Sequence, residues 1–177
     1  MATTVSYEDW LPMPEVQDAT EEVIDGEIRI SPPAKWTHAW TVEMISRSLH
    51  EQLDISGYLV LTGRMGLVIR TNPLTVRGPD LAIFEKRTIV EREGFVHSAP
   101  QLVAEVLAPG EDLSRRLADY AALGVPEVWV VSPEARTVEI LYLDNGFLRT
   151  SHILASGVLT PKLFPQVSVD IAKIWPD

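Results

Sequence analysis

The sequence predicts a mixed α/β fold in which a central mixed sheet is flanked by helices. LVAEVL (102–107) and EVWVVS (127–132) are apolar runs with almost no alternation, which is typical of strands buried on both faces. Between them, residues 112–123 carry apolar residues at helical spacing, and Gly124 and Pro126 follow as stop signals. A strand–helix–strand unit of this kind predicts a right-handed parallel crossover.

The remaining elements follow from periodicity and turn signals. Asp25-Gly26 predicts a hairpin within 21–30. Residues 35–53 predict the longest helix, because apolar residues recur there at helical spacing. Its predicted apolar face consists of Trp36, Trp40, Met44, Ile45, Leu49 and Leu53. Further strands are predicted at 58–62, 66–71 and 79–85, an irregular polar segment at 86–98, a hairpin at 137–154, and a short strand near 167–169 before a last helical turn.

Length and composition exclude several classes of protein. The 177 residues suit an acidic N-terminal arm at 1–20 and a single domain at 21–177. The absence of cysteine excludes disulfides, thiolate metal sites and a cysteine nucleophile, and it fits a reducing cytoplasm. No apolar run approaches the roughly 20 residues that span a bilayer, and the N-terminus lacks the features of a secretory signal. We therefore expect a cytoplasmic protein that does not enter a membrane.

The charge of the chain is unevenly distributed. The formal net charge of −10 argues against a protein that coats nucleic acid. Residues 64–92, however, hold more bases than acids. The bases are Arg64, Arg70, Arg77, Lys86, Arg87 and Arg92. This segment is either a local positive face or ordinary solvated charge, and the counts leave both interpretations open.

Two acids are placed where simple packing does not explain them. Glu105 lies inside the apolar strand LVAEVL, and Asp80 directly follows Gly78-Pro79 at the start of another strand. If these strands are neighbours, both carboxylates point to one end of the sheet and favour a hard divalent cation such as Mg²⁺. The alternative is a Glu105–arginine ion pair with Asp80 forming a turn. A pair of acids also permits a glycosidase, although the sequence shows no aromatic-lined sugar cleft.

Longer stretches carry a family resemblance. The chain resembles the Uma-type restriction endonuclease family, within the PD-(D/E)XK nuclease superfamily, over about residues 20–175. The matching stretches are VIDGEIRISPPAKWTHAWTVEMISRSL (23–49), VRGPDLAIFEK (76–86), APQLVAEVLAP (99–109) and DLSRRLADYAALGVPEVWVVSPEARTVEIL (112–141). The resemblance implies a restriction-endonuclease-like fold and a metal-dependent endonuclease that hydrolyses phosphodiester bonds of DNA.

The resemblance also implies site residues. Asp80 and Glu105 would bind Mg²⁺ or Mn²⁺, with the backbone carbonyl of Val106 as a third ligand. Glu27 matches an N-terminal acid of the family and is either an added ligand or an exposed strand residue. His38 matches a histidine at the start of the long helix and faces either the site or solvent. The basic segment 64–92 would face the DNA backbone.

The sequence departs from the nuclease pattern at the lysine. The pattern places Lys two residues after the glutamate, where this chain has Leu107. In the resembled family the lysine usually moves to the following helix, and that place holds Arg116. Arginine compensates Glu105 and clamps phosphate, but it stays charged and does not act as a base. Arg116 thus indicates either slower cleavage or a catalytically inactive module that binds nucleic acid or a protein partner.

The sequence also supports expectations about three other cationic residues and about the oligomeric state. Arg115 is expected at the surface, and Lys35 and Lys86 are alternative cations near the same loops. Trp10 and Trp175, near the chain ends, leave apolar area for a homodimer. Cleavage of both strands of a DNA duplex would also favour a homodimer.

Overall fold

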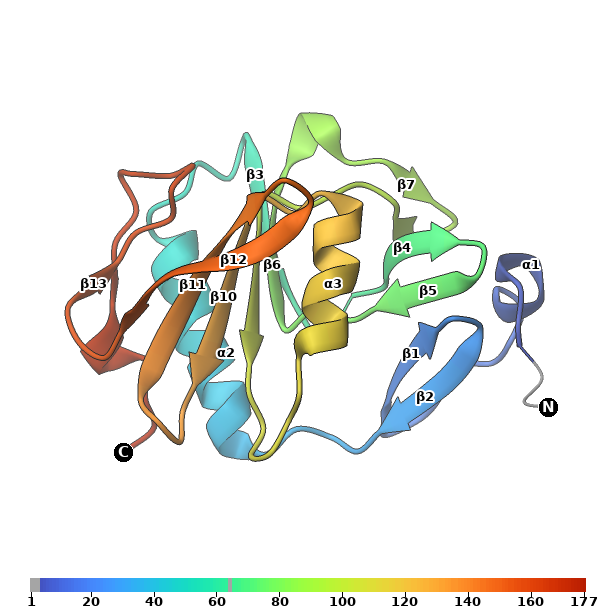
Figure 1. The fold of residues 1–177 in the computed structure, drawn as a ribbon, viewed down its shortest axis with the longest axis horizontal. Coiled ribbons are helices and arrows are strands. Elements are labelled where there is room, and N and C mark those ends of the chain that lie inside the picture. Colours follow the sequence, from blue (N-terminus) through green and yellow to red (C-terminus); the bar gives the residue numbers. More distant parts are fainter. Residues whose placement is uncertain (1–3, 64) are drawn as a thin grey trace.

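A central six-stranded mixed sheet organises the molecule (Figure 1). The computed structural model describes residues 4–63 and 65–177. The strand order is β12-β11-β10-β9-β6-β3. The strands are β3 (Tyr58–Thr62), β6 (Leu81–Glu85), β9 (Leu102–Val106), β10 (Glu127–Ser132), β11 (Thr137–Asp144) and β12 (Phe147–Leu154). β9 and β10 pair in parallel and the other neighbours pair antiparallel, which confirms the predicted crossover.

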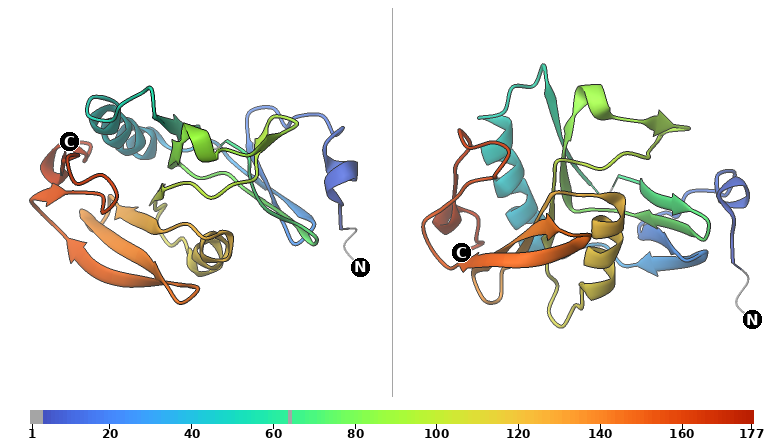
Figure 2. Two further views of the ribbon diagram at one scale, coloured as in Figure 1. Left: turned by 90° about the horizontal axis from the view of Figure 1, so that it is seen from above. Right: turned by 45° about the horizontal axis from the view of Figure 1, so that its top comes forward.

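Two helices cover opposite faces of this sheet, as the view from above in Figure 2 shows. They are α2 (Trp36–His50) and α3 (Ser114–Leu123). Because side chains of a strand alternate between faces, Ile83 of β6 packs with the α2 side of the core, whereas Phe84 packs with Tyr120 of α3. The mixed α/β fold with a helix on each side of the sheet is confirmed.

A second six-stranded sheet lies beside the first and has the order β2-β1-β5-β4-β8-β7. Its strands are β1 (Thr20–Ile24), β2 (Glu27–Ser31), β4 (Leu67–Thr71), β5 (Leu74–Arg77), β7 (Glu91–Arg92) and β8 (Phe95–Val96). The predicted hairpin turn is confirmed, since Asp25 and Gly26 both have positive φ (51° and 79°). The sequence predicts neither β5 nor the β7–β8 pair. Smaller elements are β13 (Val158–Leu159), β14 (Val169–Asp170) and 3₁₀ turns at Lys86–Thr88 and Ile171–Lys173.

The N-terminal segment packs on this second sheet instead of extending as a loose arm. Residues 1–3 of the predicted arm lie outside the described residues. Helix α1 (Tyr7–Trp10) buries Tyr7, and the Nε1 atom of Trp10 donates a hydrogen bond to Glu21 at 2.7 Å. The Val5 backbone N–H also donates to the carbonyl of Gly26 at 2.8 Å. Val5, Tyr7 and Trp10 therefore attach the beginning of the acidic segment to the second sheet.

The tryptophans are placed differently from the sequence prediction. Trp36 and Trp40 of α2 are 66% and 45% exposed, although the helical pattern places them on the apolar face. The buried side chains of the helix are Thr41, Ile45, Ser46 and Leu49. At 3.6 residues per turn, Trp36 and Trp40 lie on the opposite side of the helix. Trp175, expected to offer area for a homodimer, is buried. None of the helices in the described part of the chain is long and apolar enough to cross a membrane.

Candidate active site

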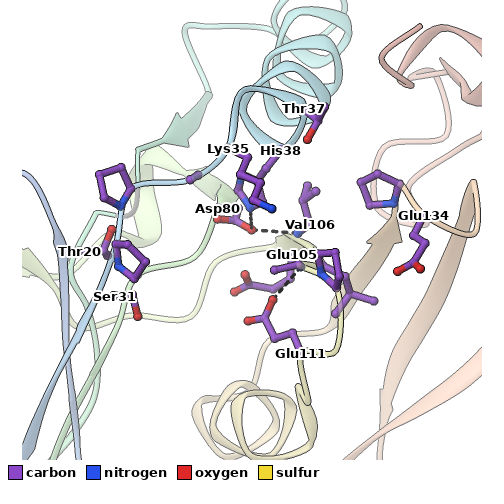
Figure 3. Close-up of a pocket in the computed structure, with 18 of the residues that line it drawn as sticks. Thr20, Ser31, Lys35, Thr37, His38, Asp80, Glu105, Val106, Glu111 and Glu134 are labelled. Carbon is purple, nitrogen blue, oxygen red and sulfur yellow. Dashed lines mark hydrogen bonds and ion pairs between the residues drawn. The ribbon is translucent and has the colours of Figure 1, made fainter.

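The two unexplained acids meet at one end of the central sheet. β6 and β9 pair antiparallel with Leu81 opposite Ala104, and one further step of this register places Asp80 opposite Glu105. The two residues are only 5% and 4% exposed, yet both line one cavity of about 540 Å³ (Figure 3). The strand pairing therefore brings together the carboxylates that the sequence singles out.

The walls of the cavity come from segments that are far apart in the sequence. They are the loop after β2 with the first turn of α2 (31–38), the segment after β9 (106–111) and the loop after β10 at Pro133 and Glu134. Prolines form much of the rim: Pro32, Pro33, Pro109, Pro133 and Pro176. Since the proline ring fixes the backbone φ angle, these loops form a stiff entrance around an acidic floor.

Asp80 is fixed by two donors. Its Oδ2 atom lies 3.0 Å from Nε2 of His38 and accepts a hydrogen bond from the Val106 backbone N–H at 2.9 Å. His38 reaches it from the first turn of α2, as the dashed contact in Figure 3 shows. Of the two placements that the sequence leaves open for His38, the structure shows the one that faces the site.

Only one of the two carboxylate oxygens of Glu105, Oε1, contacts hydrogen-bond donors. The Tyr120 hydroxyl donates to Oε1, and Nη1 of Arg116 lies 3.4 Å from the same atom. Oε2 accepts no hydrogen bond from any residue that the structure describes. Within residues 4–63 and 65–177, every fully buried side-chain polar atom has a partner. Oε2 therefore keeps contact with the cavity.

Burial controls the protonation of Glu105. The pKa of Glu105 is raised to about 8, because desolvation and the nearby Asp80 together outweigh the opposing effects of Arg116 and the Tyr120 hydrogen bond. Burial also raises the pKa of Tyr120 well above its ordinary value, so its hydroxyl keeps the proton that it donates. A strongly perturbed carboxyl in a cavity is typical of a functional site.

Arg116 reaches Glu105 but is held mainly by Glu22. Its Nη1 and Nη2 atoms donate to the two carboxylate oxygens of Glu22 at 2.8 and 2.9 Å. Glu22 also accepts from the Gly78 backbone N–H at 2.8 Å and from Nη1 of Arg77 at 3.3 Å. The alternative interpretation of Glu105 as one half of a simple arginine pair therefore describes only part of its surroundings.

Glu22 and Tyr120 are the site residues that sequence reasoning misses. Glu22 lines the cavity, whereas Glu27, the predicted acid, does not. Glu27 lies at the turn end of the β1–β2 hairpin, where it pairs with Arg29. A usable signal existed for Tyr120, because it lies four residues after Arg116 and so on the same helix face.

Two bases of the segment 64–92, Arg70 and Arg77, form internal pairs, whereas Lys86, Arg87 and Arg92 are exposed. Arg77 is buried and donates to Asp119 through Nε and Nη2 at 2.8 and 2.6 Å. Arg70 pairs with Asp119 and Asp25. Arg64 lies outside the described residues. Arg70 and Arg77 therefore join α3 to the second sheet.

The other predicted cations are placed as follows. Lys35 lines the cavity, and Lys86 donates to the Ile55 carbonyl away from it. Arg115 pairs with Asp25 at the partly exposed surface. Lys35 is thus the alternative cation that the structure brings to the site.

The donor set is compatible with a hard cation that retains water ligands. Among the described residues, no group of three or more His, Cys, Asp and Glu side chains is arranged to hold a metal ion. Mg²⁺, however, is commonly held by one or two carboxylates together with water and substrate oxygens. Asp80 and Glu105 supply oxygen donors of this type.

Comparisons with known proteins agree with the resemblance. The model of the Uma2 family, described as "Putative restriction endonuclease", matches residues 6–172. The fold is similar to the crystal structure of a "putative nuclease belonging to DUF820" from Anabaena variabilis ATCC 29413, with a TM-score of 0.80 and 15% identity over 96% of this chain and 97% of that chain. No curated protein matches. The predicted restriction-endonuclease-like fold is confirmed, and the chain belongs to the Uma2 family.

Proposed function

We propose that the chain is a Mg²⁺- or Mn²⁺-dependent endonuclease that hydrolyses phosphodiester bonds of DNA. The observation that carries the proposal is the convergence of Asp80 and Glu105 in one cavity, with Oε2 of Glu105 directed to it and unpaired among the described residues. A bound divalent cation supplies an activated water and stabilises charge on the phosphoryl group. Family membership supports the same reaction class.

The residues of the chain have distinct parts in this proposal. Asp80, oriented by His38 and the Val106 N–H, and Glu105, oriented by the Tyr120 hydroxyl, bind the cation. The Val106 carbonyl is the proposed third ligand. Glu105 releases its proton on binding, because a ligating carboxylate must be ionised.

Arg116 provides positive charge next to Glu105. Its double hydrogen bond to Glu22 fixes the guanidinium plane and also offsets part of its charge. It therefore assists by neutralising charge rather than by accepting a proton. Lys35, at the cavity wall, is the second cation available to a phosphate.

A catalytically inactive binding module is the second candidate. It is favoured by one observation, namely that Leu107 replaces the pattern lysine while Arg116 is already bound to an acid. In this case the cavity binds nucleic acid or a protein partner without cleaving it.

Calorimetry with Mn²⁺ tests the proposed site. We expect Glu105→Gln and Asp80→Asn each to weaken Mn²⁺ binding by at least about tenfold, because each removes one anionic ligand. Glu134→Gln is the matched control, since Glu134 lines the same cavity without belonging to the proposed ligand set. Equal Mn²⁺ affinity in the wild type and Glu105→Gln would refute the site.

Cleavage assays separate the two candidates. The wild type is incubated with Mn²⁺ and plasmid, single-stranded DNA or RNA, beside Glu105→Gln. Cleavage that is lost in Glu105→Gln supports the endonuclease. Intact substrates at high protein concentration, combined with Mn²⁺ binding, favour the inactive module.

A further inference from the structure

An exposed stripe runs along α2 on the side that points away from the core. It consists of Trp36, Trp40, Glu43 and Arg47, all of them exposed. At 3.6 residues per turn, these four side chains lie opposite the buried residues of the helix. Their spacing of four, three and four residues is typical of a seam along which two helices pack. Since α2 lies at the periphery of the molecule (Figure 2), the stripe is open to a second macromolecule.

A shallow groove borders the C-terminal half of this stripe. It is lined by Glu43, Ser46, Arg47, His50, Glu51 and Thr62. The aliphatic stem and the guanidinium of Arg47 form a surface on which an aromatic ring packs well. The stripe thus has two indoles toward the start of α2 and a groove suited to an aromatic side chain toward its end. Such an arrangement is complementary to an antiparallel copy of itself.

The charges of the stripe support a second copy of this chain as its partner. The chain has a formal net charge of −10, so two copies repel each other over most of their surfaces. The stripe is an exception, because Glu43 and Arg47 have opposite charges and lie one turn apart. Neither of them forms an ion pair with another residue that the structure describes. Nucleic acid and anionic lipid are disfavoured, because both would approach the carboxylates of Glu43 and Glu51.

We propose that the chain forms a symmetric homodimer in which the α2 helices of two copies pack antiparallel along this stripe. When Glu43 of each copy faces Arg47 of the other, the two-fold axis passes near Ile45. The same register brings Trp40 of each copy opposite His50 of the other, and so to the groove. Charge pairing and the position of the groove therefore support one register.

This homodimer uses a different surface from the one that the sequence suggests. Its interface buries Trp36 and Trp40 in place of Trp10 and Trp175, of which Trp175 is already buried within the monomer. The arrangement also separates the two candidate active sites. Because a helix rises about 1.5 Å per residue, the first turns of the two α2 helices, and with them the two cavities, lie at opposite ends of the pair, roughly 27 Å apart along its axis.

Sedimentation velocity at protein concentrations from about 1 to about 100 µM tests the proposal. We expect the wild type to sediment as a dimer at the upper end of this range. Trp36→Ala and Trp40→Ala should each raise the dissociation constant at least about tenfold, because each substitution removes two indoles from a two-fold interface. Phe147→Ala is the control, since it removes an aromatic side chain that is as exposed as Trp36, at 66%, from β12. It should leave the dissociation constant unchanged.

Charge reversal tests the register. Glu43→Arg and Arg47→Glu should each sediment as monomers, because like charges then face each other across the interface. An equal mixture of the two variants should recover the mass of a dimer, because every facing pair is again opposite in charge. Substitutions that merely damage the helix would not restore association on mixing.

The proposal is overturned by a dimer that persists in the tryptophan and charge variants, by an equal loss in Phe147→Ala, or by a mixture of the charge variants that stays monomeric. A monomeric wild type also overturns it, and binding of that monomer to single-stranded DNA or lipid vesicles through Trp36 and Trp40 would assign the stripe to that partner. These measurements need neither Mn²⁺ nor a substrate, so their outcome is independent of the proposed endonuclease.

Discussion

Two buried carboxylates on the α3 side of the central sheet differ in how completely their oxygens are hydrogen-bonded. Asp119 of α3 accepts three hydrogen bonds from guanidinium groups, two from Arg77 and one from Arg70. Glu105 of β9 is equally buried, but its two donors converge on Oε1 while Oε2 is directed to the cavity. The first carboxylate is surrounded by cations, and the second is left partly uncompensated.

The difference lies between a fully paired carboxylate and one that retains an unpaired oxygen. A buried acid whose oxygens are filled by arginines connects parts of the fold and has no capacity left for a ligand. A buried acid with a raised pKa and an oxygen open to a cavity destabilises the free protein and is compensated when a cation binds. Both residues are buried carboxylic acids, so the difference between them lies in their hydrogen-bond partners.

Removal of Asp119 is expected to have the largest effect on stability. Asp119→Ala leaves the guanidinium of Arg77 buried without its carboxylate, and we expect the free energy of unfolding to fall by about 3–5 kcal/mol. Urea denaturation measures the change. Asp144→Ala is the control, because it breaks the exposed pair with Arg149 and should cost at most about 1 kcal/mol. Similar losses in the two variants would contradict the structural role of Asp119.

Glu105→Gln should act in the opposite direction and depend on pH. The pKa of Glu105 is raised from 4.5 to about 8 in the folded protein, so the folded state holds a proton that the unfolded state has released between these values. Stability is therefore fully present below 4.5 and is lost as the pH rises through about 8. Glutamine does not titrate. Without metal, we expect Glu105→Gln to be more stable than the wild type by on the order of 5 kcal/mol near pH 8.5.

The measurement is a comparison of urea denaturation of the two proteins at about pH 4 and about pH 8.5. The stability difference between them should nearly vanish at the lower pH, because Glu105 is then protonated in both the folded and unfolded states. Glu134→Gln, at an exposed acid of the same cavity, should show no such pH dependence. A difference that grows toward low pH would mean that Glu105 is ionised and well compensated in the folded protein.

The sequence predicts the central sheet and the carboxylate pair because both leave local signals. β9 and β10 are apolar on both faces, and Glu105 is conspicuous as a charged residue in such a strand. β5 leaves no such signal, since four buried residues between turn-forming residues have no measurable period. The sequence also does not predict the exposure of Trp36 and Trp40, because the broad apolar face of the helix does not show which part of it packs against the sheet.

The β1–β2 hairpin shows most directly which feature of the site the sequence does not predict, namely which of its acids reaches the cavity. Glu22 and Glu27 lie in one short acidic hairpin, and no local pattern separates them. Pairing of β1 with β5 determines which acid reaches the site, because it brings Glu22 to Arg77 and Gly78 and leaves Glu27 at the turn end. Such long-range pairing is a property of the assembled sheet and is not visible in a single strand.

The smallest predicted change in the free energy of unfolding comes from substitutions of Glu22 and Glu27. Glu22→Gln weakens the double hydrogen bond to Arg116 and the contact with Arg77, so we expect the free energy of unfolding to fall by about 1.5–3 kcal/mol. Glu27→Gln breaks only an exposed pair with Arg29 and should change it by less than about 0.5 kcal/mol. Urea denaturation near neutral pH measures both changes. Because the two substitutions are chemically identical, an equal or larger loss in Glu27→Gln would show that the arginine partners of Glu22 do not set the contribution of this acid to stability.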